Sequence, residues 1–298
     1  MMSARFLTVV LERAFNMRDG FGREIDYMRI SVIDSCNLNC YYCNPCDNNE
    51  HCHALNILSV KEVLCIVRAA TRLGIKHFRL TGGEPLLHPQ LDEMVLQIKK
   101  IPGVSSVSLT TNAVLLAQHA KWLKEAGIDS INVSLDTIDA SEYERITKKP
   151  LLEEVKHGIN AAIECGIRVK INVVLTPQTD VVALTRYVAK KGTDIRFIEM
   201  MPVGEGHTNG VEPYKKVIGT LSKLYGEPCR INTEKTKEIN SENDKRKIPD
   251  NGPAEYYIFP ELGIRVGLIQ AIHGKFCDTC NRIRVTADGR LMPCLGSS

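Results

Sequence analysis

The stretch Tyr27–Cys43 reads YMRISVIDSCNLNCYYC and contains the two features that indicate the fold. Its first part, Tyr27–Ile33, is typical of a β-strand. Three cysteines follow with the spacing C-x3-C-x2-C, at Cys36, Cys40 and Cys43. Parallel α/β sheets place their functional loops after the carboxyl ends of strands. The order therefore predicts an α/β protein with a metal site at that edge of its sheet.

Strand-like and helix-like segments continue to alternate as far as Met200. The segment Ser59–Leu73 has helical spacing, and Ser59 with Glu62 three residues on forms a capping-box pattern. Six strands are predicted, at 27–33, 76–80, 104–109, 130–135, 168–175 and 194–200, with helices at 59–73, 90–100, 115–126, 151–165 and 181–190. This rhythm predicts right-handed βαβ units and a parallel sheet. Because a closed barrel needs eight units, we expect an α/β fold with a partial (β/α)6 barrel.

The rhythm ends after Met201. Residues 230–250 are polar and charged and have no apolar period, so they predict a long surface loop. Residues 254–260 and 264–270 predict a strand pair, and the segment after them carries a second group of cysteines. We expect two parts: the partial barrel over residues 1–205, and over residues 206–298 a C-terminal region that carries a second iron–sulfur cluster and binds substrate.

Composition narrows the class of protein. The 298 residues are 44% hydrophobic, and the net charge of +3 is too small to argue for a nucleic-acid partner. No run approaches the roughly 18 apolar residues of a membrane helix, and no secretion signal is evident, so we expect a cytoplasmic protein without a membrane partner. Eleven cysteines in a reducing compartment favour metal ligation over disulfides. The isolated Cys65, Cys165 and Cys229 are expected to be buried and inert.

Each cysteine group has three members. Three thiolates hold three irons of a [4Fe–4S] cube and leave the fourth iron open, as a catalytic site requires. The second group has the spacing C-x2-C-x13-C, at Cys277, Cys280 and Cys294. Zinc is the alternative at both sites. Its fourth ligand would be Cys46, Cys52, His51 or His53 at the first site and His273 at the second.

Other motifs indicate a bound cofactor and an anionic substrate. The turn Thr81–Pro85 (TGGEP) ends the second predicted strand, where glycines let the backbone approach a ligand and Glu84 offers an acceptor for an ammonium group. Basic residues alternate with apolar ones on predicted strands, at Arg29, Arg79, Lys170, Arg196, Arg282 and Arg284. Basic side chains inside a barrel are costly unless an anion meets them, so a phosphorylated substrate is predicted. Exposed surface arginines are the alternative interpretation.

The first cysteine group, Tyr42 before its last cysteine, and the GGEP turn together resemble the radical S-adenosylmethionine (SAM) signature. More closely, the chain over residues 20–295, apart from the charged loop, is similar to the GTP 3′,8-cyclase family. The segments that carry this resemblance are YMRISVIDSCNLNCYYCNP, FRLTGGEPLL, LTTNAVLL, INVSLDTID, VKINVV, IRFIEMMPVG and FCDTCNRIRVTADGRLMPCL.

The resemblance implies two [4Fe–4S] clusters and SAM as cofactors, and cyclisation of GTP to 3′,8-cyclo-7,8-dihydro-GTP, the first step of molybdenum cofactor biosynthesis. SAM would supply a 5′-deoxyadenosyl radical that takes hydrogen from C3′ of GTP, and the C3′ radical would add to C8. Residues implied to contact the cofactor are Tyr42, Gly83, Glu84, Thr111, Ser134, Asn172 and Met200. The six basic residues above would bind GTP, whose purine would meet the second cluster. No side chain is implied as a catalytic acid or base.

The resemblance also implies an electron donor such as flavodoxin or ferredoxin, and it leaves a homodimer open. The chain departs from the family at Ser35, Asn44, His77 and Ala113. The family ends in a Gly-Gly tail, whereas this sequence stops at Ser298, so we expect cyclisation to increase when such a tail is added. A divergent radical SAM enzyme that acts on another nucleotide or a peptide is the alternative function. A non-enzymatic iron–sulfur or zinc-binding protein is a second alternative.

Overall fold

The computed structural model describes residues 17–43, 56–202, 211–231 and 252–294. Its strands form one sheet of 11 strands in the order β11-β10-β1-β2-β3-β4-β5-β6-β9-β8-β7. The parallel centre consists of β1 (Tyr27–Ser31), β2 (His77–Thr81), β3 (Ser106–Thr111), β4 (Ser130–Ser134), β5 (Val169–Leu175) and β6 (Asp194–Glu199). The structure confirms all six predicted strands. The parallel order, which follows the chain from β1 to β6, is that of a barrel.

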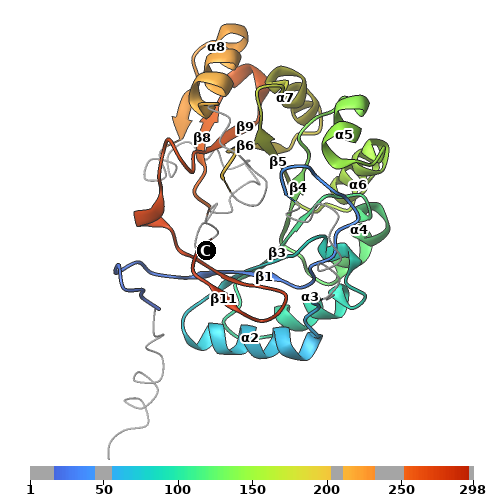
Figure 1. The fold of residues 1–298 in the computed structure, drawn as a ribbon, viewed down its shortest axis with the longest axis vertical. Helices are drawn as coiled ribbons and strands as arrows, with labels where there is room; N and C mark the ends of the chain where they lie inside the picture. Colours follow the sequence, from blue (N-terminus) through green and yellow to red (C-terminus); the bar gives the residue numbers. More distant parts are fainter. Residues whose placement is uncertain (1–16, 44–55, 203–210, 232–251, 295–298) are drawn as a thin grey trace, which may run out of the picture.

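Helices cover the outside of the curved sheet (Figure 1). The predicted ones are confirmed as α2 (Val60–Arg72), α3 (Leu91–Lys99), α4 (Leu116–Glu125), α6 (Leu152–Glu164) and α7 (Val181–Lys190). The capping box of α2 is also confirmed, because the Ser59 hydroxyl accepts from the Glu62 amide and the Glu62 carboxylate accepts from the Ser59 amide. These helices bury apolar stripes against the sheet, such as Val63, Val67 and Ala70 of α2.

The outward residues of the central strands are apolar and fully buried. Ile30, Phe78, Leu109, Ile131 and Ile171 are all 0% exposed. Their neighbours in sequence point to the inside of the barrel, because side chains alternate along a strand. The residues of this second set are largely polar. The sheet is therefore held from outside by the hydrophobic packing of the helices, and its interior is left for polar groups.

The C-terminal region supplies both edges of the sheet. Strand β9 (Arg265–Ile269) pairs in parallel with β6, and β10 (Arg282–Val285) pairs in parallel with β1. The antiparallel strands β8 (Glu255–Ile258), β7 (Cys229–Ile231) and β11 (Leu291–Met292) lie outside them. The sheet curves without closing, so the partial barrel is confirmed (Figure 1). The predicted strand pair is confirmed as β8 and β9.

Both predicted parts of the chain contribute to this one sheet. The division into residues 1–205 and 206–298 stays a prediction, because the boundary lies outside the described residues, as does most of the predicted loop at 230–250.

Within the described ranges, two helices were not predicted. Helix α5 (Ala140–Thr147) lies between β4 and α6, and its N-cap Asp139 accepts a hydrogen bond from the Glu142 amide at 2.8 Å. Helix α8 (Gly219–Tyr225) follows a π-helical turn. Both are short, so their apolar period is weak in the sequence. The remaining turns are η2 (Pro85–Leu87), η3 (Tyr214–Ile218), η4 (Pro260–Leu262) and η5 (Cys277–Thr279).

The expectation for the isolated cysteines was wrong. Cys65 on α2 and Cys229 on the edge strand β7 are exposed, and Cys165 is half-buried. Neither an amphipathic helix nor an edge strand buries all of its positions, and the sequence does not mark the covered ones. Among the described residues, no helix combines the length and hydropathy needed to cross a membrane.

Candidate active site

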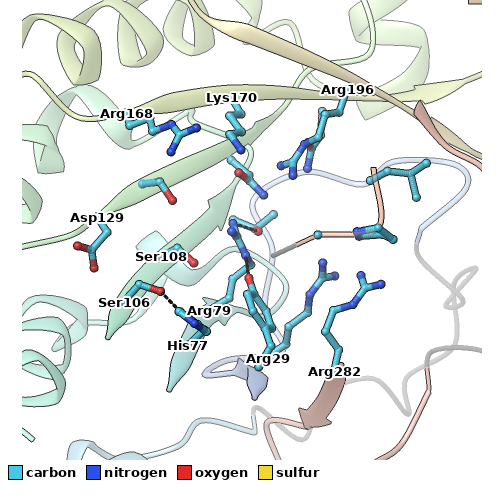
Figure 2. A pocket seen from close by; sticks show the side chains of 18 of the residues that line it. Arg29, His77, Arg79, Ser106, Ser108, Asp129, Arg168, Lys170, Arg196 and Arg282 are labelled. Carbon is cyan, nitrogen blue, oxygen red and sulfur yellow. Dashed lines mark hydrogen bonds between the residues drawn. The ribbon is translucent and has the colours of Figure 1, made fainter. Parts of the chain in front are cut away.

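A cavity of about 640 Å³ occupies the inside of the barrel and is lined by residues of the parallel strands and β10. Figure 2 shows basic side chains that point into this space from opposite walls. The described lining residues include seven lysines and arginines: Arg29, Lys76, Arg79, Arg168, Lys170, Arg196 and Arg282. The described acids of the lining are Asp26 and Asp129, and Asp129 is already paired with Lys99 at 2.9 Å. The cavity is therefore strongly positive.

The surroundings of Arg29 indicate that the positive charge of the cavity would be stabilised by a bound anion. Across the sheet Arg29 lies beside Arg284 on one side and Arg79 on the other. Its Nε is buried without a hydrogen-bond partner among the described residues. Burial, and then the nearby charge of Arg284, lower the pKa of Arg29 to about 9. A buried cation in this position is costly until an anion pairs with it.

Other basic residues are held in place by the protein. Arg79 donates to the Tyr27 hydroxyl and to the Leu109 carbonyl at 3.1 Å. Arg196 Nε donates to Asn172 Oδ1 at 2.9 Å. Arg196 also needs Gly267 beside it, because a Cβ there would lie 2.8 Å from the Arg196 Cγ. The two guanidinium groups are thus oriented before any substrate arrives.

Five of the six predicted substrate residues line this one cavity. Arg284 does not, although it neighbours Arg29 in the sheet and is partly buried. Asn172, assigned to the cofactor by the resemblance, lines the same cavity and orients Arg196. Sequence reasoning missed other polar residues of the lining, among them Tyr27, Ser108, Thr110, Asn132 and Arg168. The period-2 alternation that identified Lys170 would also have identified Arg168 and Asn132.

Two of the departures from the family pattern have a structural reading. His77 lines the cavity and bonds Ser106 Oγ through Nδ1 at 2.8 Å, and burial lowers its pKa, so it adds little positive charge at neutral pH. Ala113 has a φ of 65°, a left-handed conformation that costs a non-glycine residue about 1–2 kcal/mol. A glycine at this position would avoid that cost. Asn44 lies outside the described residues.

The first cysteine group lies at the carboxyl end of β1. The Cys36 sulfur accepts from the Leu38 amide at 3.5 Å and from the Asn112 side chain at 3.7 Å. Burial raises the pKa of all three thiols, that of Cys40 to about 12. Without metal the thiols therefore stay protonated, and loading must release protons.

The described residues contain no group of three potential ligands that converges on one metal ion. The assignment of Cys36, Cys40 and Cys43 as cluster ligands stays a prediction from their spacing. The alternative zinc ligands of the first site, Cys46, Cys52, His51 and His53, lie outside the described residues.

The GGEP turn is packed against the start of the cysteine loop. The Gly83 amide donates to the Ile33 carbonyl at 2.8 Å, and the Glu84 amide donates to the Ser35 carbonyl at 2.7 Å. A Cβ on Gly83 would lie 2.2 Å from the Ser35 oxygen and 2.3 Å from the Asp34 oxygen. The glycines were expected to let the backbone approach a ligand. In the structure they let it approach the backbone that leads into Cys36.

Glu84 is 1% exposed, and its carboxylate accepts three hydrogen bonds. It accepts from the Thr111 hydroxyl and the Asn112 amide, both at 2.7 Å, and from the Leu86 amide at 3.0 Å. Burial raises the pKa of Glu84 to about 7. The carboxylate therefore links the end of β2 to the end of β3. Its role as an acceptor for the ammonium group of SAM stays a prediction.

The other residues assigned to the cofactor lie at the same carboxyl edge. Ser134 ends β4 and is exposed toward a small cavity that Cys40 and Tyr42 also line. Met200 follows β6 and is 8% exposed. Their contacts with SAM stay predictions.

The second cysteine group lies at the opposite end of the parallel strands. Cys277 and Cys280 precede β10, whose first residue Arg282 pairs with Tyr27 at the start of β1. Cys294 follows β11, which runs antiparallel to β10 and so returns toward the same end. The lining of the large cavity extends along the strands from Tyr27 at the start of β1 to Ile198 near the end of β6. The cavity therefore lies between the ends of the sheet that carry the two cysteine groups.

Segments distant in sequence hold the second group in place. Arg23 Nη1 donates to the Cys277 carbonyl at 2.6 Å, and Asn281 Nδ2 donates to Asp26 Oδ1 at 2.6 Å. His273, the alternative zinc ligand, has its Nδ1 on the Glu199 carboxylate. Like the first group, this one presents three thiols, which fits a cube with one open iron.

Comparison with known proteins agrees with this arrangement. The Radical SAM superfamily model matches residues 30–184, and the Molybdenum Cofactor Synthesis C model matches residues 193–298. The chain is 37% identical over 282 residues to "GTP 3′,8-cyclase" of Clostridium perfringens (strain SM101), covering 94% of this chain and 83% of that protein. It belongs to the GTP 3′,8-cyclase family.

Further similarities support the assignment. The family member of Pelotomaculum thermopropionicum is 38% identical, over 94% of this chain and 84% of its own. Among solved structures, Streptococcus suis SuiB bound to a precursor peptide has a TM-score of 0.65 at 15% identity, covering 98% of this chain and 63% of SuiB. Methylornithine synthase has a TM-score of 0.53 at 16% identity, covering 76% of this chain and 71% of its own. These structures share the fold. As a radical SAM family member, the chain uses SAM and iron–sulfur clusters.

The packing of the GGEP turn predicts that Gly83→Ala specifically weakens the first cluster site. The added methyl would meet two carbonyl oxygens, and relieving such overlap typically costs about 1–3 kcal/mol. Iron per chain after anaerobic reconstitution should fall from about eight toward about four. Gly219→Ala is the control, because a Cβ added at Gly219 would have no atom within 4 Å. Unchanged iron in Gly83→Ala would contradict this account.

The raised pKa of Glu84 predicts a pH dependence of stability. Folding moves this pKa from 4.5 to about 7, so between these values the folded state holds a proton that the unfolded state has lost. Stability therefore falls as pH rises through this window, by about 2 kcal/mol between pH 5 and 7. In Glu84→Gln that component of the slope should disappear, as measured by denaturant unfolding of the metal-free protein. If the pH profiles of stability of the two proteins are parallel, Glu84 does not cause this pH dependence.

The uncompensated charge of Arg29 predicts two opposite effects in Arg29→Met. The metal-free variant should be more stable than the parent without ligand, because a buried charge is removed. It should bind tripolyphosphate about tenfold more weakly, which is the loss of one charged hydrogen bond. Thermal unfolding with and without tripolyphosphate, at constant ionic strength, measures both. Arg72→Met on the outer helix α2 is the control, and equal ligand shifts in both variants would refute the anion site.

Proposed function

We propose that this chain converts GTP to 3′,8-cyclo-7,8-dihydro-GTP in molybdenum cofactor biosynthesis, as the names of its relatives suggest. The observation that carries this proposal is the cationic cavity between two three-cysteine groups. A nucleoside triphosphate brings about four negative charges, which suits a cavity lined by seven basic residues and two acids in its described part. A peptide substrate would not need this charge.

The protein's own part in this reaction is binding and orientation. Arg29, Arg282 and Lys170 would hold phosphate oxygens, and the prealigned Arg196 would fix their direction. When bound, SAM and the first cluster supply the radical that removes the C3′ hydrogen. The second cysteine group would hold the iron that meets the guanine base. If the base meets the second cysteine group, a nucleotide in the cavity would direct its ribose toward the SAM side.

We further propose that SAM lies at the carboxyl edge, between the cysteine loop and the exposed Ser134. Glu84 would act there indirectly, by fixing the Asn112 backbone and Thr111. The electron required would come from a donor of the flavodoxin or ferredoxin class. The cytoplasmic location and a homodimer stay predictions.

The test uses GTP deuterated at C3′. The protein is reconstituted anaerobically and incubated with SAM and dithionite. One hydrogen leaves C3′ for the adenosyl group, and one electron and one proton complete the product, so the new nucleotide has the elemental composition of GTP. Deuterium should therefore appear in 5′-deoxyadenosine. Arg282→Ala should weaken GTP binding about ten- to a hundredfold and leave uncoupled SAM cleavage intact. ATP, CTP and UTP deuterated at the same position are tested in parallel. Deuterium transfer from one of them but not from GTP would favour the alternative of a divergent radical SAM enzyme.

A further inference from the structure

We propose that the connection between β4 and α6 positions the first cysteine group: Asp136 orients Tyr42, and the carboxyl end of α5 binds the loop on both sides of Cys40. The proposal rests on the proposed function only in taking Cys36, Cys40 and Cys43 as cluster ligands. Asp136 and α5 act through the cysteine loop, so they are positioning elements rather than catalytic residues.

Asp136 joins two elements with its two carboxylate oxygens. Oδ1 accepts from the Val174 amide of β5 at 2.7 Å, and Oδ2 accepts from the Tyr42 hydroxyl. Strand β4 ends at Ser134, two residues before Asp136, whereas β5 continues to Leu175. The Asp136 side chain therefore accepts from a β5 amide that lies beyond the end of β4. The carboxylate is thereby fixed to the rigid sheet. Tyr42, which lies between Cys40 and Cys43 in sequence, is tied to the sheet through it.

The carboxyl end of α5 supplies the second attachment. The Asn39 amide donates to the Thr147 carbonyl at 3.0 Å, and the Tyr41 amide donates to the Ile146 carbonyl at 3.1 Å. The last carbonyls of a helix lack partners within the helix, so they are available for this contact. The two bonds flank Cys40 directly. On the outside, the Arg145 guanidinium lies 5.6 Å from the centre of the Tyr41 ring.

The termination of α5 makes these carbonyls accessible. Lys148 turns into the left-handed region with a φ of 60°, and its amide bonds back to the Glu144 carbonyl at 2.8 Å. The chain therefore leaves the helix sharply. Thr147 is 5% exposed. Its hydroxyl donates to the Tyr143 carbonyl at 2.8 Å and so stabilises the same turn.

The cysteine loop is thus held at two places by different parts of the chain. Its start, at Ile33 and Ser35, is bound by the GGEP turn, and its middle, from Asn39 to Tyr42, is bound by the β4–α6 connection. A loop fixed in this way loses less conformational freedom when a cluster binds. We infer that Cys40 is prepositioned before iron arrives.

Hydrogen exchange of the metal-free full chain tests this inference without requiring a cluster. In Tyr42→Phe and Asp136→Ala, the amides of Asn39 and Tyr41 should exchange about tenfold faster, the equivalent of losing one hydrogen bond to a charged acceptor. The amides of Gly83 and Glu84, which bind the other end of the loop, should keep the parent rate. Asp136→Asn should be intermediate, because its Oδ1 can accept from the Val174 amide and its Nδ2 can donate to the Tyr42 hydroxyl, but neither bond then has a charged acceptor. Tyr41→Phe is the matched control, since it removes a hydroxyl from the neighbouring exposed ring.

Iron loss to a chelator is the second measurement. In Tyr42→Phe the first cluster should be lost several-fold faster than in Tyr41→Phe, with the second cluster unchanged. Equal exchange at Asn39 and Tyr41 in the two tyrosine variants would overturn the proposal, and so would acceleration that extends equally to Gly83. Tyr42→Phe removes only a hydroxyl, so it carries the test even if Asp136→Ala does not fold. Confirmed exchange effects in a protein that binds zinc instead of iron would leave the positioning role intact and overturn the proposed function.

Discussion

The buried positive charge inside the barrel is the constraint on which the rest of the structure depends. A parallel sheet ordinarily buries apolar residues on both faces. Here only the outer face is apolar, and the helices cover it, whereas arginines and lysines line the inner face. Such an interior cannot collapse into a packed core, because mutually repelling cations without an anion are costly. The open curvature of the sheet and the cavity are both consistent with an interior built to hold a polyanion.

Parallel topology then places the cysteine groups. The loop after β1 leaves at the carboxyl edge, and the segment before β10 enters at the amino edge, because β10 runs parallel to β1 beside it. The two sites are therefore separated by the length of a strand, with the cationic cavity between them. Each cysteine group is attached to distant segments: the first to the GGEP turn and α5, the second to Arg23 near the start of the described chain. The proposed division between radical generation at one group and substrate binding at the other relies on this separation.

Several sequence motifs make contacts within the protein that the sequence did not predict. Gly83 allows two backbone segments to meet, and Glu84 joins two strand ends. Asn172 orients a basic residue in the substrate cavity. In each case the contact supports the site through the protein, and the contact with the cofactor stays a prediction. A short motif specifies which residues matter more reliably than it specifies which atoms they touch.

The sequence by itself determined the alternation of strands and helices, the partial barrel, the two cysteine groups and the inward basic residues. These features are local or periodic: cysteine spacing, strand alternation and helix caps can be read without knowing which segments meet. Only the tertiary structure decided that Asp136 meets Tyr42, that α5 binds the cysteine loop, and that Arg29 lies half-buried beside other arginines with its Nε buried. Those contacts join residues far apart in the chain, and their energies depend on burial, which no local pattern records.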